Sequence, residues 1–374
     1  MFCRVFWRRW PAVVAGASLC AACGMPISRL PAIPPAQALA IEQRSEQVAQ
    51  IQAYYAQLAR VDNVAFRIRT ANRQFCKSVA AQIGLHAATV RSLPSKYRSY
   101  TNQALNVSWT KATVIAVADG SPAAAAGIKT GDRILRLNDK PVPAGRTQHW
   151  IDEFLASNGM QPVKVDLRRD GEEKTLTVSP LMACAIPIDY VTNDQINAYS
   201  TGDKIVIFSA IVALAKTDDQ LAVIIGHELA HANLGHMEKR EQNALIGELG
   251  GVMVDGGFLL GGIYTRGAFT RHFGRAGALA YSVEFEREAD YVGAYYAARA
   301  DYDVAGAAQI WRAMGQTNPH SIRFTTDHPM SPVRYIQMRE VAAEIADKER
   351  RHLPLIPELK ESAPPAAAPA NYNY

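Results

Sequence analysis

The sequence predicts an α+β fold, in which a mainly helical unit with a small edge sheet accompanies a separate β-rich unit. Three observations lead to this prediction. Thr217 and two acidic residues precede an apolar stretch, as at the N-terminus of a helix. Residues 281–296 repeat apolar side chains at helical spacing. Two β-rich segments, 163–167 and 175–178, flank Asp170-Gly171, which is a strong signal for a β-hairpin.

Length and composition fit a chain of two domains with extensions. The 374 residues are 48% hydrophobic, which supports well-formed cores. Arg4, Arg8 and Arg9 supply three of the five net positive charges, so the rest of the chain carries only +2. That balance gives no argument for a nucleic-acid partner, and we expect none.

The first 23 residues have the features of an export signal. A basic start precedes an apolar run, residues 10–22, that is too short to span a bilayer comfortably. Residues 19–23 resemble a bacterial lipobox in which Cys23 would be lipidated, although Cys20 stands where leucine is usual. We therefore expect a lipoprotein of the bacterial periplasm, anchored in the outer membrane in preference to the inner one. Cleavage by ordinary signal peptidase and a retained anchor helix are the alternatives.

Cysteine usage agrees with export. Once Cys3, Cys20 and Cys23 are assigned to the signal segment, Cys76 and Cys184 remain as an even pair. In an oxidising compartment such a pair predicts a disulfide. Two buried free thiols are the alternative.

The segment His227-Glu228-Leu229-Ala230-His231 indicates a metal site. Histidines four residues apart lie on one face of a helix, so both imidazoles can reach one zinc ion. Glu228 can then take a proton from a water bound to the metal. The alternative is an ordinary amphipathic helix with two surface histidines.

A catalytic zinc site needs a third protein ligand and keeps one position for water. The pattern with a third histidine six residues after His231 fails, because that position is Met237. His236 is one place short, and we expect it to point elsewhere. The ligand must then come from another helix.

Residues 281–290 are the source that we expect for this ligand. Glu286 and Asp290 are four residues apart and share a helix face, whereas Glu284 and Glu288 lie on other faces. The small Gly293 on this helix would permit a close approach to the first helix. We therefore expect Glu286 to bind zinc and Asp290 to accept the N–H of a ligand histidine. A solvated helix surface is the alternative.

His-Glu-x-x-His followed by Glu-x-x-x-Asp resembles the HtpX-like and BepA-like gluzincin metallopeptidases, over roughly residues 189–339. The resemblance implies a zinc endopeptidase with one Zn²⁺ per chain and Glu228 as general base. It implies protein or peptide substrates, namely misfolded or unassembled proteins of the cell envelope. Residues 204–208 fit the family's edge strand. The segment 325–334 resembles a late family segment, which implies that His328 and Arg334 reach the active site, where they would stabilise the oxyanion or gate the metal.

Residues 107–180 resemble a PDZ domain of the bacterial protease type, through Ser121-Pro122-Ala123, Ala126-Gly127-Ile128 and residues 131–135. Such domains take extended peptides by strand addition. No clear glycine-rich carboxylate-binding loop precedes Thr113, so a structural or regulatory module is the alternative. This unit also supports a second function class, an adaptor or chaperone-like lipoprotein that holds clients and cleaves rarely.

Two further segments complete the organisation. Residues 41–93 show helical spacing, and residues 244–264 are apolar and glycine-rich, although their charges and glycines argue against a membrane span. We interpret residues 244–264 as a mobile lid or a buried hairpin. The expected domains are a signal segment with lipobox (1–23), a tether (24–40), a helical segment packing on the catalytic domain (41–100), a PDZ-like domain (101–182), a zinc metallopeptidase domain (183–353) and a disordered Pro/Ala-rich tail (354–374).

Overall fold

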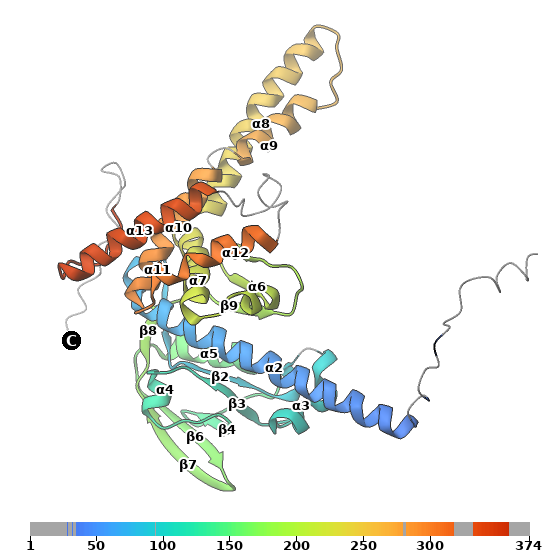
Figure 1. Ribbon diagram of the computed structural model, residues 1–374, viewed down its shortest axis with the longest axis vertical. Coiled ribbons are helices and arrows are strands. Elements are labelled where there is room, and N and C mark those ends of the chain that lie inside the picture. Colours follow the sequence, from blue (N-terminus) through green and yellow to red (C-terminus); the bar gives the residue numbers. More distant parts are fainter. Residues whose placement is uncertain are drawn as a thin grey trace, which may run out of the picture. The chain divides into compact units, whose positions relative to one another are not determined.

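The computed structural model describes residues 35–93, 95–279, 282–317 and 332–358, together with Ser28 and Ala32. The chain forms two compact units, Met1–Glu46 and Gln47–Tyr374. The described part of the first unit is almost entirely the start of helix α2 (Ala36–Ala71). The second unit contains a mainly helical part and a β-rich part, which confirms the predicted α+β class (Figure 1).

Helix α7 (Asp218–Leu234) lies at the centre of the helical part, and every residue from Leu221 to Ala232 is buried. It begins as predicted, because the Thr217 side chain accepts a hydrogen bond from the Gln220 N–H at 3.3 Å. It ends at Gly235, whose φ of 69° is a left-handed conformation that favours glycine. Helices α10 (Ser282–Arg299) and α11 (Val304–Ala307) pack against it. The helical part also contains α6 (Ser209–Leu214), α12 (Gln309–Thr317) and α13 (Pro332–Arg350).

A three-stranded sheet lies beside α7, in the order β10 (Ala198–Ser200), β11 (Ile205–Phe208), β9 (Ile188–Val191). β11 pairs antiparallel with β10 and parallel with β9. The prediction that residues 204–208 form an edge strand is therefore wrong, since β11 is the central strand. Its uninterrupted apolar sequence, buried at all four residues, is typical of a strand covered on both faces. β10 has one edge that no described strand pairs.

Helix α2 packs on the helical part, since Ile51, Tyr55 and Ile68 join the same core cluster as α7 and α10. The helix ends at Ala71, so the prediction of helix up to residue 93 is wrong beyond that point. Strands form there instead, separated by a turn at Gly84 with φ of 73°. The elements between α2 and the β-rich part are η2 (Arg73–Phe75), β1 (Val79–Gln82), β2 (Leu85–Ala88), η3 (Val90–Ser92), η4 (Ser95–Tyr97) and α3 (Arg98–Leu105).

A disulfide joins Cys76 to Cys184, with Cα atoms 5.6 Å apart, inside the range that disulfides require. Strand β1 pairs antiparallel with β8 (Leu181–Cys184), and Val79 lies opposite Cys184. Cys184 belongs to the core cluster of the helical part. The bond therefore fixes the chain at both ends of the β-rich part, as the even pair of cysteines predicted.

The β-rich part has its own core and a sheet in the order β2, β3 (Ala112–Val117), β4 (Arg133–Leu137), β6 (Val163–Arg169), β7 (Glu172–Val178), with β5 (Lys140–Pro141) paired to β4. The predicted hairpin at Asp170-Gly171 is present, and both residues have positive φ. Helices α4 (Pro122–Ala125) and α5 (Thr147–Asn158) complete this part. Its first strand begins at Leu85, earlier than residue 101, where the sequence suggested that the unit starts.

Helix α8 (His236–Leu260) and helix α9 (Ala268–Leu279) form a hairpin that projects from the helical core (Figure 1). Residues 244–264 are thus mostly the outer length of α8, and large apolar side chains there are exposed, with Leu260 at 93%. The interpretation as a buried hairpin is wrong, and the segment extends away from the core instead of covering it. Among the described helices, α8 is long and apolar enough to cross a membrane by length and composition.

Candidate metal centre

Two glycines bring the helices of the site together. α7 and α10 cross at Gly226 and Gly293, where a Cβ on Gly293 would lie 2.6 Å from the His227 backbone nitrogen. A Cβ on Gly226 would lie 2.4 Å from the Gly293 carbonyl oxygen. Side chains at this crossing would push the helices apart. The close approach at Gly293 was predicted from the sequence, whereas that at Gly226 was not.

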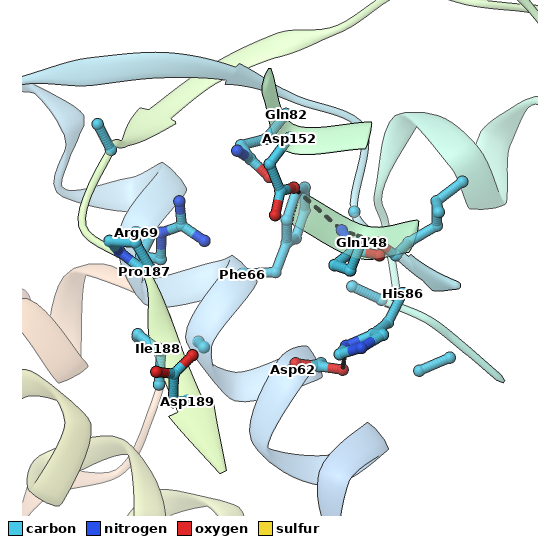
Figure 2. Close-up of a pocket in the computed structure, with 16 residues that line it drawn as sticks. Asp62, Phe66, Arg69, Gln82, His86, Gln148, Asp152, Pro187, Ile188 and Asp189 are labelled. Atoms are coloured by element: carbon cyan, nitrogen blue, oxygen red, sulfur yellow. Dashed lines mark hydrogen bonds and ion pairs between the residues drawn. The ribbon is translucent and has the colours of Figure 1, made fainter. Parts of the chain in front are cut away.

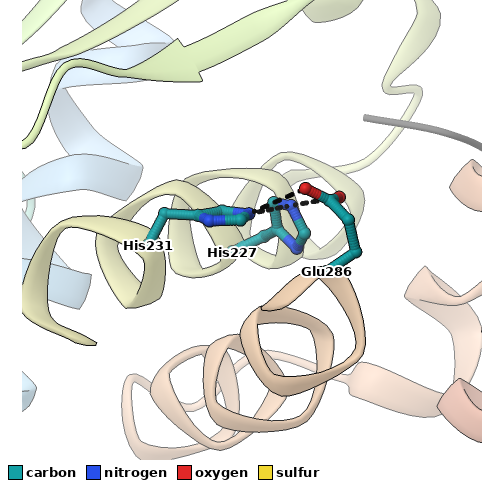
Figure 3. Close-up of side chains that lie close together, drawn as sticks. All are labelled: His227, His231 and Glu286. Carbon is teal, nitrogen blue, oxygen red and sulfur yellow. Dashed lines mark hydrogen bonds and ion pairs between the residues drawn. The ribbon is translucent and has the colours of Figure 1, made fainter. Parts of the chain in front are cut away.

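The close crossing brings three predicted ligands into one cluster (Figure 3). The Nε2 atoms of His227 and His231 are 3.0 Å apart. The Glu286 carboxylate lies 3.4 Å from the first of these atoms and 3.3 Å from the second. All three side chains are buried, and one ligand atom from each lies within 4.8 Å of the others. Two imidazole nitrogens and one carboxylate oxygen are the donor set of a catalytic zinc site.

Asp290 and Arg334 support this cluster from behind. The Nδ1 of His227 lies 2.9 Å from Asp290 Oδ1, which fixes the ring with Nε2 toward Glu286. Arg334 donates two hydrogen bonds of 2.7 Å to Asp290 and lies 3.1 Å from Glu286. Arg334 thus contacts carboxylates of the cluster, which suits a positioning role. His328, which was predicted to reach the active site together with Arg334, lies outside the described residues. The predicted lipidation site Cys23 also lies outside them.

The electrostatics of the site suit a bound cation. Burial alone would lower the pKa of His227, but its hydrogen bonds to Asp290 and Glu286 raise it to about 10. Burial would likewise raise the pKa of Asp290, but the charge of Arg334 holds it below its ordinary value. Glu228 is also buried, at 2% exposure, and its charge acts on Arg334. Three buried carboxylates therefore surround one permanent cation, so the residues present fit a divalent metal ion.

The structure places His236 against the site, contrary to the expectation that it points elsewhere. It does not join the three-donor cluster, but its Nδ1 lies 2.9 Å from the Nδ1 of His231. Its Nε2 lies 3.0 Å from Glu288, which was expected on a face away from the site. His236 and Glu288 therefore support the ring of His231, as Asp290 supports the ring of His227. The sequence signal is Gly235, which turns the chain between α7 and α8.

A cavity of about 200 Å³, separate from the metal centre, lies where α2 meets the β-rich part (Figure 2). Gly84 turns the chain into the edge strand β2, and a Cβ there would lie 2.9 Å from the ring of Phe66 in α2. The sequence did not indicate this turn before the edge strand. Across the cavity, Asp62 of α2 lies 2.8 Å from His86 of β2. Burial would lower the pKa of His86, but the charge of Asp62 and the hydrogen bond to it raise it.

The outer edge of β2 is occupied by a side chain of α5. The Gln148 carbonyl oxygen accepts a hydrogen bond of 2.8 Å from the Ala87 N–H. Its amide nitrogen donates one of 3.4 Å to the Leu85 carbonyl. These are backbone groups with which an added peptide strand would pair.

Comparisons with known proteins agree with both parts of the fold. Residues 185–342 match the family model for Peptidase family M48, and residues 82–179 match that for the PDZ domain. The chain is similar to the mitochondrial metalloendopeptidase OMA1 of Schizosaccharomyces pombe, with 28% identity over 43% of this chain and 49% of that protein. It is also similar to the beta-barrel assembly-enhancing protease of Escherichia coli O157:H7, with 28% identity over 30% of this chain and 25% of that protein. The chain thus spans half or less of the length of these relatives.

Solved structures of proteins with PDZ domains or of HtrA-type proteases match over 28% of this chain. One is the HtrA3 PDZ domain bound to a phage-derived ligand, with 20% identity over 28% of this chain and 89% of that chain, at a TM-score of 0.23. Another is the HtrA-type protease AlgW with a decapeptide, with 21% identity over 28% of this chain and 30% of that chain, at a TM-score of 0.23. The chain thus contains a region that matches Peptidase family M48, preceded by a region that matches the PDZ domain.

Proposed function

We propose that this protein is a zinc-dependent endopeptidase of the gluzincin type. The observation that carries the proposal is the convergence of two histidine Nε2 atoms and the Glu286 carboxylate, with Glu228 buried directly after His227 in helix α7. His227, His231 and Glu286 would hold the ion, and their donor types favour zinc over calcium or magnesium. When bound, zinc would act as a Lewis acid and lower the pKa of a water toward about 7.

The side chains of the site divide the remaining work. Glu228 takes a proton from the attacking water, whose oxygen bonds to the scissile carbonyl carbon. It then passes this proton to the amide nitrogen as the C–N bond breaks. Asp290 holds His227, and the pair His236 and Glu288 holds His231, so both imidazoles keep Nε2 toward the reaction. Glu286 in turn is held by Arg334.

The free edge of β10 is the place where we expect an extended substrate segment to bind. β10 packs beside α7, the helix that carries Glu228, and none of the described strands pairs with its outer edge. Backbone pairing with that edge would recognise any extended chain regardless of side chains. This mode of binding fits unfolded proteins, and the substrates proposed are misfolded or unassembled proteins of the bacterial envelope. Export and lipidation at Cys23, with anchoring in the outer membrane, belong to the same proposal.

An adaptor that binds clients through the PDZ domain without cutting them is the second candidate. The contacts of Gln148 argue against it, because they already use the Leu85 and Ala87 backbone groups at the peptide-pairing edge. Phe66 of α2 lies against the loop at Gly84 that opens the same edge. Peptide capture there would first have to displace a side chain of this protein itself.

Incubation of the full-length protein with casein separates the two candidates. The endopeptidase should produce fragments, stop when a chelator is added, and recover when zinc but not magnesium is restored. An adaptor should produce no fragments and should still suppress aggregation of an unfolded client in the presence of the chelator. Undiminished cleavage in chelator would contradict the proposal of a metal-dependent enzyme.

A further inference from the structure

Exposed apolar side chains recur along α8. This helix projects from the fold (Figure 1). Met253 is 79% exposed and Leu260 is 93% exposed, and Tyr264 beyond the helix is 76% exposed. Scattered exposed apolar residues are normal on protein surfaces, but a contiguous patch marks an interaction site. The exposed apolar residues of this surface, which we call the α8 stripe, are Leu245, Ile246, Leu249, Val252, Met253, Leu259, Leu260, Ile263 and Tyr264.

The hairpin is a self-packed unit, so the α8 stripe is not the uncovered half of a missing core. Glycines bring α8 and α9 into backbone contact, since a Cβ on Gly247 would lie 2.1 Å from the Phe273 carbonyl oxygen. A Cβ on Gly277 would lie 2.1 Å from that of Asn243. Contacts between small residues of this kind stabilise helix pairs where water supplies no hydrophobic drive.

The acidic residue at the far end of the hairpin is satisfied internally. Asp255 accepts a hydrogen bond of 2.8 Å from the Thr270 N–H and one of 2.7 Å from the Thr270 hydroxyl. It also accepts hydrogen bonds from the Thr265 hydroxyl and the Phe269 N–H. The carboxylate therefore caps α9 and does not depend on water for its partners. The Asp255 carboxylate would therefore keep its hydrogen-bond partners if the hairpin moved from water into a membrane interface.

The charges on α9 decide between a membrane span and a surface arm. Arg271 and Arg275 are four residues apart and exposed, and Arg266 is exposed in the connecting loop. Arginine is unfavourable at the bilayer centre, so two arginines on a helix of 12 residues oppose a span. The α8 stripe from Leu245 to Leu260 is about 24 Å long, short of the roughly 30 Å hydrocarbon core. An apolar face joined to a basic face is typical of a helix that lies in the membrane interface.

We infer that the α8–α9 hairpin is a membrane-surface arm that buries the α8 stripe in a lipid bilayer and places the α9 arginines among anionic headgroups. The arm is far in sequence from the expected N-terminal anchor at Cys23. The membrane surface would contact the far end of α8. Because α8 follows directly on helix α7, which carries the two ligand histidines, the arm would set the distance of the metal centre from the membrane. Arginines near an anionic surface are attracted to it, which makes binding dependent on lipid charge and on salt.

Vesicle binding of the full-length protein without a lipid on Cys23 tests the arm with a matched pair of variants. Met253→Glu with Leu260→Glu changes the α8 stripe. Met160→Glu with Leu353→Glu changes the same residue types at sites that are each 41% exposed. In vesicles of phosphatidylcholine with phosphatidylglycerol, the first variant should bind about tenfold or more weakly than the second. Equal binding of the two variants would overturn the inference. So would wild-type protein that binds vesicles with and without phosphatidylglycerol equally well.

Photocrosslinking supplies a second readout, which does not depend on the N-terminal segment or on tolerance of charged substitutions. A benzophenone amino acid replaces Leu260 in one protein and Leu353 in another, and both are irradiated with the same vesicles. Adducts with lipid at position 260 but not at position 353 are expected. Adducts at position 260 with a second copy of the protein instead of lipid, or no adducts at all, would contradict a membrane-surface arm.

Discussion

Replacing Gly293 by alanine should damage the metal centre without changing any ligand. The added Cβ would lie 2.6 Å from the His227 backbone nitrogen and 2.7 Å from the Gly226 carbonyl carbon. Ordinary contacts begin near 3.4 Å, so α10 must move away from α7 by most of an ångström. Overpacking of this kind costs about 1–3 kcal/mol, and alanine returns about 0.5–1 kcal/mol through its better helix propensity. We therefore expect a net loss of about 1–2 kcal/mol in the free energy of unfolding.

The same shift separates Glu286 on α10 from the two histidines on α7. We expect zinc affinity to fall about tenfold, the lower end of what displaced supporting groups cause. Competition with a fluorescent chelator measures the affinity, and thermal unfolding measures the stability. Gly256→Ala is the matched control, because a Cβ at this glycine of helix α8 meets nothing within 4 Å. Wild-type zinc affinity and stability in Gly293→Ala would refute the role given to the helix crossing.

Three further outcomes follow from single contacts. Asp290→Ala should lower zinc affinity about 10–100-fold, whereas Glu284→Ala should leave it unchanged; metal analysis showing the reverse would reject the assignment. Replacing both Cys76 and Cys184 by serine opens a loop with a sequence separation of 108 and should cost at most about 4–5 kcal/mol in denaturant unfolding; an unchanged midpoint would contradict this. Asp62 raises the pKa of His86 in the folded protein above 6.5, its value in the unfolded chain. The stabilisation that this ion pair gives to the fold is therefore complete below pH 6.5 and is lost as the pH rises through the pKa of the folded protein. The stability difference between wild type and His86→Gln should therefore be larger at about pH 6 than at about pH 9, and the opposite trend would reject the ion pair.

The two pairs of side chains that build the metal cluster were predictable from sequence, because helix geometry fixes each pair. A spacing of four residues places His227 beside His231, and the same spacing places Glu286 beside Asp290, whatever the rest of the chain does. The cap at Thr217 was predictable for the same reason, since it depends on neighbours in sequence.

The features that sequence reasoning missed depend on turns and on tertiary pairing. His236 returns to His231 because Gly235 adopts a left-handed conformation, and the periodicity of α7 does not extend across it. The apolar pattern of residues 205–208 shows burial but not which strands lie on either side. The apolar residues of the α8 stripe look like core residues in the sequence, and their exposure is visible only once α9 is seen to pack on the opposite side of α8.

The central claim is that Glu228 moves the proton in a reaction at a metal held by other residues. The most direct test is the purified Glu228→Gln variant, assayed for zinc content and for casein hydrolysis beside the wild type. Glutamine keeps the size of the side chain but cannot accept the proton, so the account predicts one zinc per chain, as in the wild type, and no detectable fragments. Hydrolysis at the wild-type rate by zinc-loaded Glu228→Gln would contradict the account.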